Sequence, residues 1–159
     1  MKVKEIMTTD VVTVKPDTPV AVVAKYLREE AISGVPVVNS AGTVLGLVTE
    51  VDLIARHARP HFPAYVQFLD GIFYLESSKR YKESIRHILA TTAGELMTSP
   101  VRTVGPEMDV QDLATLMVEE RVNPVPVVDD EDAMIGIVSH SDLLEMIVRA
   151  EAKGENSKA

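Results

Sequence analysis

The apolar positions of this chain follow a helical spacing in two separate stretches that share one pattern. Each stretch places apolar residues at i, i+3, i+4 and i+7, which predicts an amphipathic helix. The positions are Val20, Val23, Ala24 and Leu27 in the first stretch, and Val110, Leu113, Ala114 and Met117 in the second. Pro19 suits the first position of the first helix, and Asp109 suits the N-cap of the second.

Short β-branched runs follow each predicted helix and indicate strands. Residues 35–38 and 125–128 read Val-Pro-Val-Val, and each run pairs with a second arm, 44–49 or 134–139, to form a hairpin. A proline cannot donate to a ladder, so each of these strands should lie at an edge or a bulge. Shorter strands are expected at 11–14 and 101–104, single helical turns at 3–7 and 93–97, and a second helix from about Asp52 or Asp142.

The two stretches are copies of one unit. Residues 5–54 align with 95–144 at an offset of about 90 without a gap, and about 19 of the 50 pairs are identical. The fold class is therefore α/β (α+β), with two β-α-β-β-α repeats. A unit of about 50 residues has too little core to fold alone, so the repeats should pack through their sheets in pseudo-twofold fashion. We expect repeat 1 at 1–58, an insert at 59–92, repeat 2 at 93–150 and a flexible tail at 151–159.

The insert between the repeats is rich in aromatic residues and should be helical. It contains six of the chain's seven aromatics, Phe62, Tyr65, Phe68, Phe73, Tyr74 and Tyr81. Residues 78–89 predict an amphipathic helix with Tyr81, Ile85, Ile88 and Leu89 on one face. One interpretation is a connector packed on the repeat core, and the other is an oligomer or partner interface, where aromatics concentrate.

Composition narrows the functional classes. The net charge of −8 argues against nucleic acid as the main partner, because such binding depends on clustered Lys and Arg. The absence of cysteine excludes disulfides and thiolate chemistry. No apolar run approaches the ~20 residues that span a bilayer, so we expect a cytoplasmic protein without membrane contact.

The segment 136–142 combines groups suited to a phosphorylated ligand. It passes from a strand into a helix N-terminus, where backbone N–H groups and the helix dipole favour an anion. Ser139 and Ser141 add hydroxyls, and the Asp142 carboxylate could accept bonds from a ribose. Repeat 1 has Thr49 and Asp52 in register. The other interpretation is a helix capping box, which has the same Ser/Thr and acid spacing.

These residues together resemble tandem cystathionine β-synthase (CBS) domains, a pair called a Bateman module. The resemblance rests on the Met-Thr start, the Val-Pro-Val-Val strand and the Gly-hydrophobic-x-[Ser/Thr]-x-x-Asp ending of both repeats. It implies a non-enzymatic regulatory module, with no required cofactor, that binds AMP, ADP, ATP or S-adenosylmethionine and forms a homodimer acting on a regulated protein.

In that family each cleft combines residues of both repeats, and the resemblance assigns two candidate sites here. Cleft 1 would use Thr13, Ile32, Ser33, Pro36, Ser139, Ser141 and Asp142. Cleft 2 would use Thr103, Arg121, Val122, Asn123, Pro126, Thr49 and Asp52. Ser139 and Ser141 would hold phosphate and Asp142 the ribose. Because its Ser-x-Ser-Asp sequence is complete, we expect cleft 1 to bind phosphate better than cleft 2, where Glu50 opposes an anion.

Other residues and functional classes offer alternatives to this assignment. His57, His61 and His87 could suggest a metal site, although Pro60 interrupts the spacing and we predict none. His140 could assist an anion, but a solvent-facing side chain is the simpler interpretation. The alternative functions are an interaction or oligomerisation module with degenerate clefts and, less favoured because no general base or metal cluster is evident, a nucleotide hydrolase.

Overall fold

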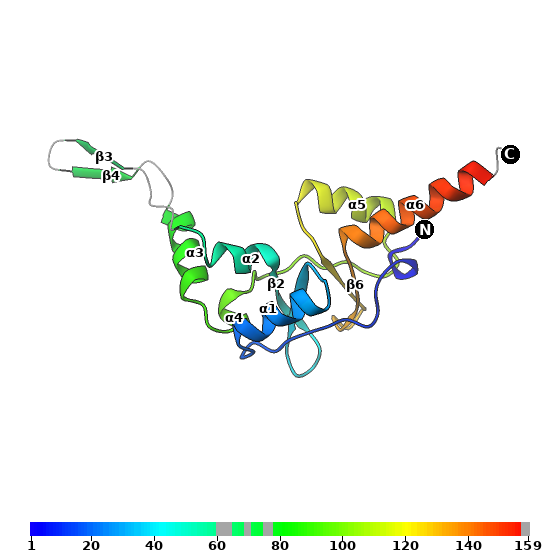
Figure 1. Ribbon diagram of the computed structural model, residues 1–159, viewed down its shortest axis with the longest axis horizontal. Coiled ribbons are helices and arrows are strands. Elements are labelled where there is room, and N and C mark those ends of the chain that lie inside the picture. Colours follow the sequence, from blue (N-terminus) through cyan, green and yellow to red (C-terminus); the bar gives the residue numbers. More distant parts are fainter. Residues whose placement is uncertain (60–64, 69–70, 75–77, 157–159) are drawn as a thin grey trace.

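The duplicated pattern forms two similar sets of helices and hairpins (Figure 1). The computed structural model describes residues 1–59, 65–68, 71–74 and 78–156, and side chains are described for 1–59 and 79–151. Repeat 1 contains η1 (Val3–Glu5), α1 (Val20–Glu29), β1 (Gly34–Val38), β2 (Val44–Thr49) and α2 (Glu50–Ala55). Repeat 2 contains α4 (Ala93–Leu96), α5 (Val110–Glu119), β5 (Val125–Val128), β6 (Met134–Val138) and α6 (His140–Asn156).

The helical spacing places the predicted residues in the core. Val20, Val23 and Leu27 of α1 are buried, as are the corresponding Val110, Leu113 and Met117 of α5. The helix starts agree with the prediction in one repeat and differ in the other. Pro19 is the N-cap of α1 and not its first helical residue. Asp109 is the N-cap of α5 as predicted, although its side chain makes no capping bond and its carboxylate pairs with Lys2 at 3.2 Å.

The strands predicted at 11–14 and 101–104 are reduced to one bridging residue each. Val14 N donates to Pro36 O at 3.0 Å, and Val14 O accepts from Val38 N at 2.9 Å. Extending this parallel ladder would need an N–H from Pro36 on one side and from Pro16 on the other, and proline has none. The same contacts surround Val104, so the prolines explain why the prediction was wrong in both repeats.

The hairpins and second helices form near the predicted positions. β1 pairs with β2 and β5 pairs with β6, both antiparallel. The pairing register shifts between Val37 and Val38 in the first hairpin and between Val127 and Val128 in the other, close to the proline of each strand. The second helices begin at Glu50 and His140, two residues before the predicted aspartates. α6 runs to Asn156, so most of the segment expected to be a flexible tail is helical.

The N-terminal segment of each repeat packs on the other repeat. Thr8 and Ile137 exchange backbone hydrogen bonds of 2.9 Å, and Leu47 and Thr98 exchange bonds of 3.1 and 2.9 Å. Val3 accordingly joins the repeat 2 core cluster, whereas residues of α4 join the repeat 1 cluster. The molecule therefore has two core clusters, and each requires residues of both repeats. The sequence did not predict this exchange of N-terminal segments.

The insert differs from the wholly helical segment that was predicted. α3 (Ser78–Leu89) has the predicted bounds, but it is preceded by a two-stranded antiparallel hairpin of β3 (Tyr65–Phe68) and β4 (Gly71–Tyr74). The hairpin extends beyond α3, away from the repeats (Figure 1). On α3, Ile85 and Ile88 are half-buried, whereas Leu89, assigned to the same face, is 69% exposed. The aromatic side chains before Tyr81 lie outside the described side chains, so the interface interpretation of the insert stays a prediction.

Candidate functional site

Both strand-to-helix junctions form the capping arrangement that the spacing suggested. Thr49 donates to Asp52 Oδ2 from its backbone N at 2.8 Å and from Oγ1 at 3.0 Å. Ser139 donates to Asp142 Oδ2 in the same way, at 2.6 and 2.7 Å. Each cap occupies one oxygen of its carboxylate. The capping box is complete at Thr49, where Asp52 N donates back to Thr49 Oγ1 at 3.4 Å, whereas at Ser139 the bonds to the carboxylate form one half of it. At both junctions the Oδ1 atom of the aspartate is left for another partner.

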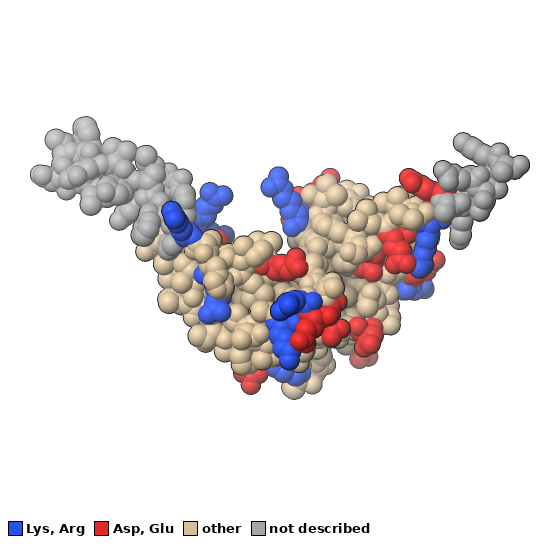
Figure 2. Space-filling view, viewed as in Figure 1, with Lys and Arg blue, Asp and Glu red and all other residues tan. Residues whose placement is uncertain are grey.

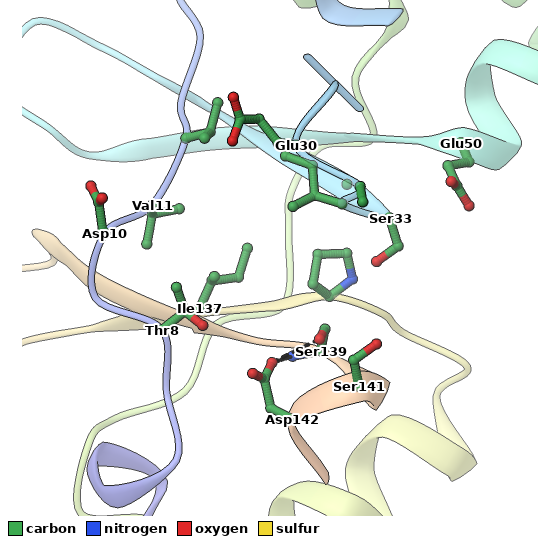
Figure 3. A pocket seen from close by; sticks show the side chains of 15 residues that line it. Thr8, Asp10, Val11, Glu30, Ser33, Glu50, Ile137, Ser139, Ser141 and Asp142 are labelled. Atoms are coloured by element: carbon green, nitrogen blue, oxygen red, sulfur yellow. Dashed lines mark hydrogen bonds between the residues drawn. The ribbon is translucent and has the colours of Figure 1, made fainter. Parts of the chain in front are cut away.

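Cleft 1 is a cavity of about 440 Å³ between the two repeats (Figure 3). The structure brings together five of the residues assigned to it: Ile32, Ser33, Ser139, Ser141 and Asp142. The two others do not line it. Pro36 is fully buried inside the hairpin, and Thr13 lies beside the bridging residue without reaching the cavity. Residues that the assignment missed also line it, namely Thr8, Asp10, Val11, Val12, Glu30, Ala31, Gly34, Glu50, Pro124 and Ile137.

Cleft 2 is a larger cavity of about 730 Å³ related to the first by the duplication. Five assigned residues line it: Thr49, Asp52, Arg121, Val122 and Asn123. Thr103 and Pro126 do not, for the same reasons as their counterparts in cleft 1. The missed residues include Leu47, Glu50, Val51, Thr98, Pro100, Val101, Arg102 and Glu120. The surface is hollowed between α2 and the C-terminal end of α5, where these residues lie (Figure 2).

The missed residues share a structural origin. Asp10 to Val12 and Thr98 to Arg102 belong to or directly follow the exchanged N-terminal segments, which reach the far repeat. Glu30 and Glu120 end α1 and α5. Both sets occupy matching positions about 90 residues apart, so once one set is known to line a cavity the duplication identifies the other.

One hydrogen-bonded wall separates the clefts. Asn123 Nδ2 donates to Ser33 Oγ at 3.3 Å, and Asn123 Oδ1 accepts from His140 N at 2.8 Å. Ser33, Glu50 and Pro124 line both cavities. The His140 side chain is exposed and is not among the residues lining cleft 1, in agreement with the solvent-facing interpretation. Because the backbone N of His140 donates to Asn123, the first N–H of α6 is already bonded within the protein.

The two clefts carry different charges. Cleft 1 is lined by four carboxylates, Asp10, Glu30, Glu50 and Asp142, and by no Lys or Arg. Cleft 2 contains Glu50, Asp52 and Glu120 together with two arginines, Arg102 and Arg121. This distribution argues against the expectation that cleft 1 is the better phosphate site, because an anion there would meet carboxylates and no cation.

The Asp52 side chain also faces the insert. It is 7% exposed, and its Oδ1 lies 3.9 Å from Nε2 of the half-buried His87 on α3. His57 Nδ1 lies instead 3.3 Å from Leu53 O. Within the described residues no group of three His, Cys, Asp or Glu side chains could hold a metal ion, and His61 lies outside them. No helix in the described part of the chain is long and apolar enough to span a membrane.

Comparison with known proteins supports the relationship that the motifs indicated. The family model described as the CBS domain matches residues 3–59 and 93–149. An uncharacterized protein of Methanocaldococcus jannaschii is 30% identical over 155 residues, which cover 93% of this chain and 92% of the relative. The chloroplastic CBSX2 of Arabidopsis thaliana is 26% identical, and the match covers 91% of this chain but 61% of that protein.

Solved structures share the same fold. CBSX2 in complex with AMP superimposes with a TM-score of 0.75 at 26% identity, covering 93% of this chain and 97% of that one. The CBS domain pair of protein MJ0100, in complex with 5-methylthioadenosine and S-adenosyl-L-methionine, has a TM-score of 0.69 at 23% identity. It covers 94% of this chain and 98% of its own. The mixed helix and sheet architecture with paired repeats is therefore that of CBS pairs.

Proposed function

The chain belongs to the CBS-domain family, and we propose from that premise that it is a non-enzymatic regulatory module that binds an adenosyl ligand between its two repeats. The observation that carries the proposal is the pair of interrepeat cavities, each formed by the start of a second helix from one repeat and the residues before a hairpin of the other. Pockets of 300–1,000 Å³ are typical of small-ligand sites. The similarity to CBSX2, whose structure contains AMP, favours an adenine nucleotide.

Each cavity offers suitable partners for such a ligand. In cleft 1 the hydroxyls of Ser33 and Ser141 face each other across the opening (Figure 3), and Asp142 Oδ1 is available to a ribose hydroxyl. In cleft 2 the corresponding carboxylate is that of Asp52, whose Oδ1 also lies 3.9 Å from His87 Nε2. Apolar side chains such as Ile32 and Val122 provide surfaces on which an adenine ring can pack.

Calorimetric titration of ligand-free protein tests this function. The titrants are AMP, ADP, ATP, S-adenosylmethionine and adenosine, with cytidine monophosphate as a matched non-adenine control. We expect saturable heat from at least one adenosyl compound and none from the control. The absence of binding by every adenosyl compound would refute the proposal and would favour the alternative of an interaction module with degenerate clefts.

We further propose that the module signals through a homodimer formed by helices of both repeats. Several large apolar side chains on α2 and α6 are exposed, including Ile54 at 69% and Leu144 at 62%, which occupy matching positions in the repeats. Val51 on α2 and Val148 on α6 enlarge this surface. Exposed apolar groups of this kind mark interaction surfaces, and a ligand that binds one dimer geometry better would shift the population towards it.

Light scattering tests the dimer. The double variant Ile54→Lys, Leu144→Lys should have the mass of a monomer, because two charges would have to be buried at the interface. Glu131→Lys, on the exposed turn between β5 and β6, is the control and should leave the mass unchanged. A dimer that persists in the double variant would rule out this interface.

A further inference from the structure

The clefts differ in charge at one pair of matching positions, Ala31 and Arg121. Both residues follow the last turn of a helix, α1 or α5, and both have a left-handed backbone, with φ of 53° and 54°. Each lines its cavity. The backbone therefore presents the two side chains in the same way, and the difference between the clefts at this point is a methyl group against a guanidinium.

Arg121 is available to an incoming ligand. It is exposed on the wall of cleft 2, and it forms no ion pair with any residue of the described chain. The other arginine of this cleft, Arg102, is held by Glu120 at 3.0 Å, so its charge is largely balanced. Arginine is well suited to phosphate, because its planar guanidinium donates two parallel charge-assisted hydrogen bonds.

Cleft 1 lacks a comparable group and presents the opposite charge. Asp10, Glu30, Glu50 and Asp142 lie on different sides of the cavity and come from four separate segments (Figure 3). Two of the groups that suggested a phosphate site there already have partners within the protein. Ser139 Oγ donates to Asp142 at 2.7 Å, and the first N–H of α6 donates to Asn123 at 2.8 Å.

We propose, building on the function proposed above, that a phosphate-bearing adenosyl ligand binds in cleft 2 with Arg121 contacting its phosphate, and that cleft 1 discriminates against the same ligand. The two clefts thus share one backbone arrangement for an adenosyl ligand and differ in the ligand charge that each accepts. Cleft 1 is left to adenosyl compounds without phosphate, which its carboxylates tolerate or, for a cationic compound, favour.

AMP and adenosine provide the sharpest pair of probes, because they differ only by the phosphate. By calorimetry, the unmodified protein should bind AMP more tightly than adenosine. Arg121→Ala should weaken AMP binding about tenfold, the loss expected for one charge-assisted hydrogen bond, and leave adenosine binding unchanged. Alanine already occupies the matching position 31 with the same backbone, so this variant should fold, which circular dichroism verifies.

Two matched variants complete the experiment. Arg28→Ala removes an equal charge from the exposed surface of α1 and should alter neither affinity. Ala31→Arg places the guanidinium at the same backbone position in cleft 1 and should raise the number of AMP molecules bound per chain. An AMP affinity that Arg121→Ala leaves unchanged, while adenosine still binds, would overturn this inference alone. Binding of neither probe to the unmodified protein would overturn the proposed function and this inference together.

Discussion

Clefts 1 and 2 have similar backbones but differ in the charged side chains that line them. Each is built from a helix start, the residues before a hairpin and the segment that follows an exchanged N-terminal turn. Four carboxylates without a cation surround cleft 1, whereas two arginines stand among the carboxylates of cleft 2. The comparison shows that the duplication places two cavities at matching positions, whereas single side chains set the charge of each cavity.

The same comparison shows why the two clefts depend on each other. Each core cluster includes residues contributed by the other repeat, and each cavity is lined by both. Neither repeat can therefore be disturbed without affecting both sites.

The largest effect is expected from Leu113→Ala. Leu113 is fully buried on α5. Truncating its side chain leaves a cavity and should lower the free energy of unfolding by about 2–5 kcal/mol. Urea denaturation should show one transition at a lower midpoint, because the repeats share their cores. Val23→Ala at the matching position of α1 removes fewer carbon atoms and should cost less. Two separated transitions would contradict the shared framework.

A smaller effect is expected at the glycines that admit the exchanged segments. A Cβ atom on Gly46 would lie 2.8 Å from Thr98 O, whereas one on Gly136 would lie 3.1 Å from Thr8 O. Gly46→Ala forces a backbone carbonyl to move and should lower the free energy of unfolding by about 1–3 kcal/mol. Gly136→Ala should be milder. Equal stabilities of both variants and the unmodified protein would show that these contacts are not tight.

The smallest effect concerns the ion pair in cleft 2. Glu120→Gln removes the carboxylate that holds Arg102, so a second guanidinium can turn towards the ligand. AMP affinity, measured by calorimetry, should rise about threefold or more, since exposed charge pairs contribute modestly. Glu30→Gln at the matching position is the control and should change AMP affinity in cleft 2 little, since Glu30 lines cleft 1. A weaker affinity of Glu120→Gln would mean that the ion pair positions Arg102 for the ligand.

The sequence predicted the elements that depend on local periodicity. The apolar spacing located α1 and α5, and the β-branched runs located both hairpins. It failed where prolines act on a partner strand, since the single-residue bridges at Val14 and Val104 depend on missing N–H groups of Pro36 and Pro126. The hairpin before α3 was also missed, because a short apolar run does not distinguish a strand from a helix.

The site was predicted in part for a related reason. Residues within the duplicated motifs, such as Asp142 and Asn123, were identified, because the motif itself carries them to the cavity. Asp10 and Arg102 were missed, because they reach the clefts only through the exchange of N-terminal segments, a long-range contact that no local pattern encodes. The expectation that cleft 1 binds phosphate better did not take these two charges into account, and we propose cleft 2 instead.

The most direct test of the difference between the clefts is a crystal structure of the protein grown with AMP. We expect a phosphate group against the Arg121 guanidinium in cleft 2, with the ribose directed towards Asp52, and no phosphate in cleft 1. A phosphate bound between Ser139 and Ser141 in cleft 1, with cleft 2 empty, would contradict this expectation.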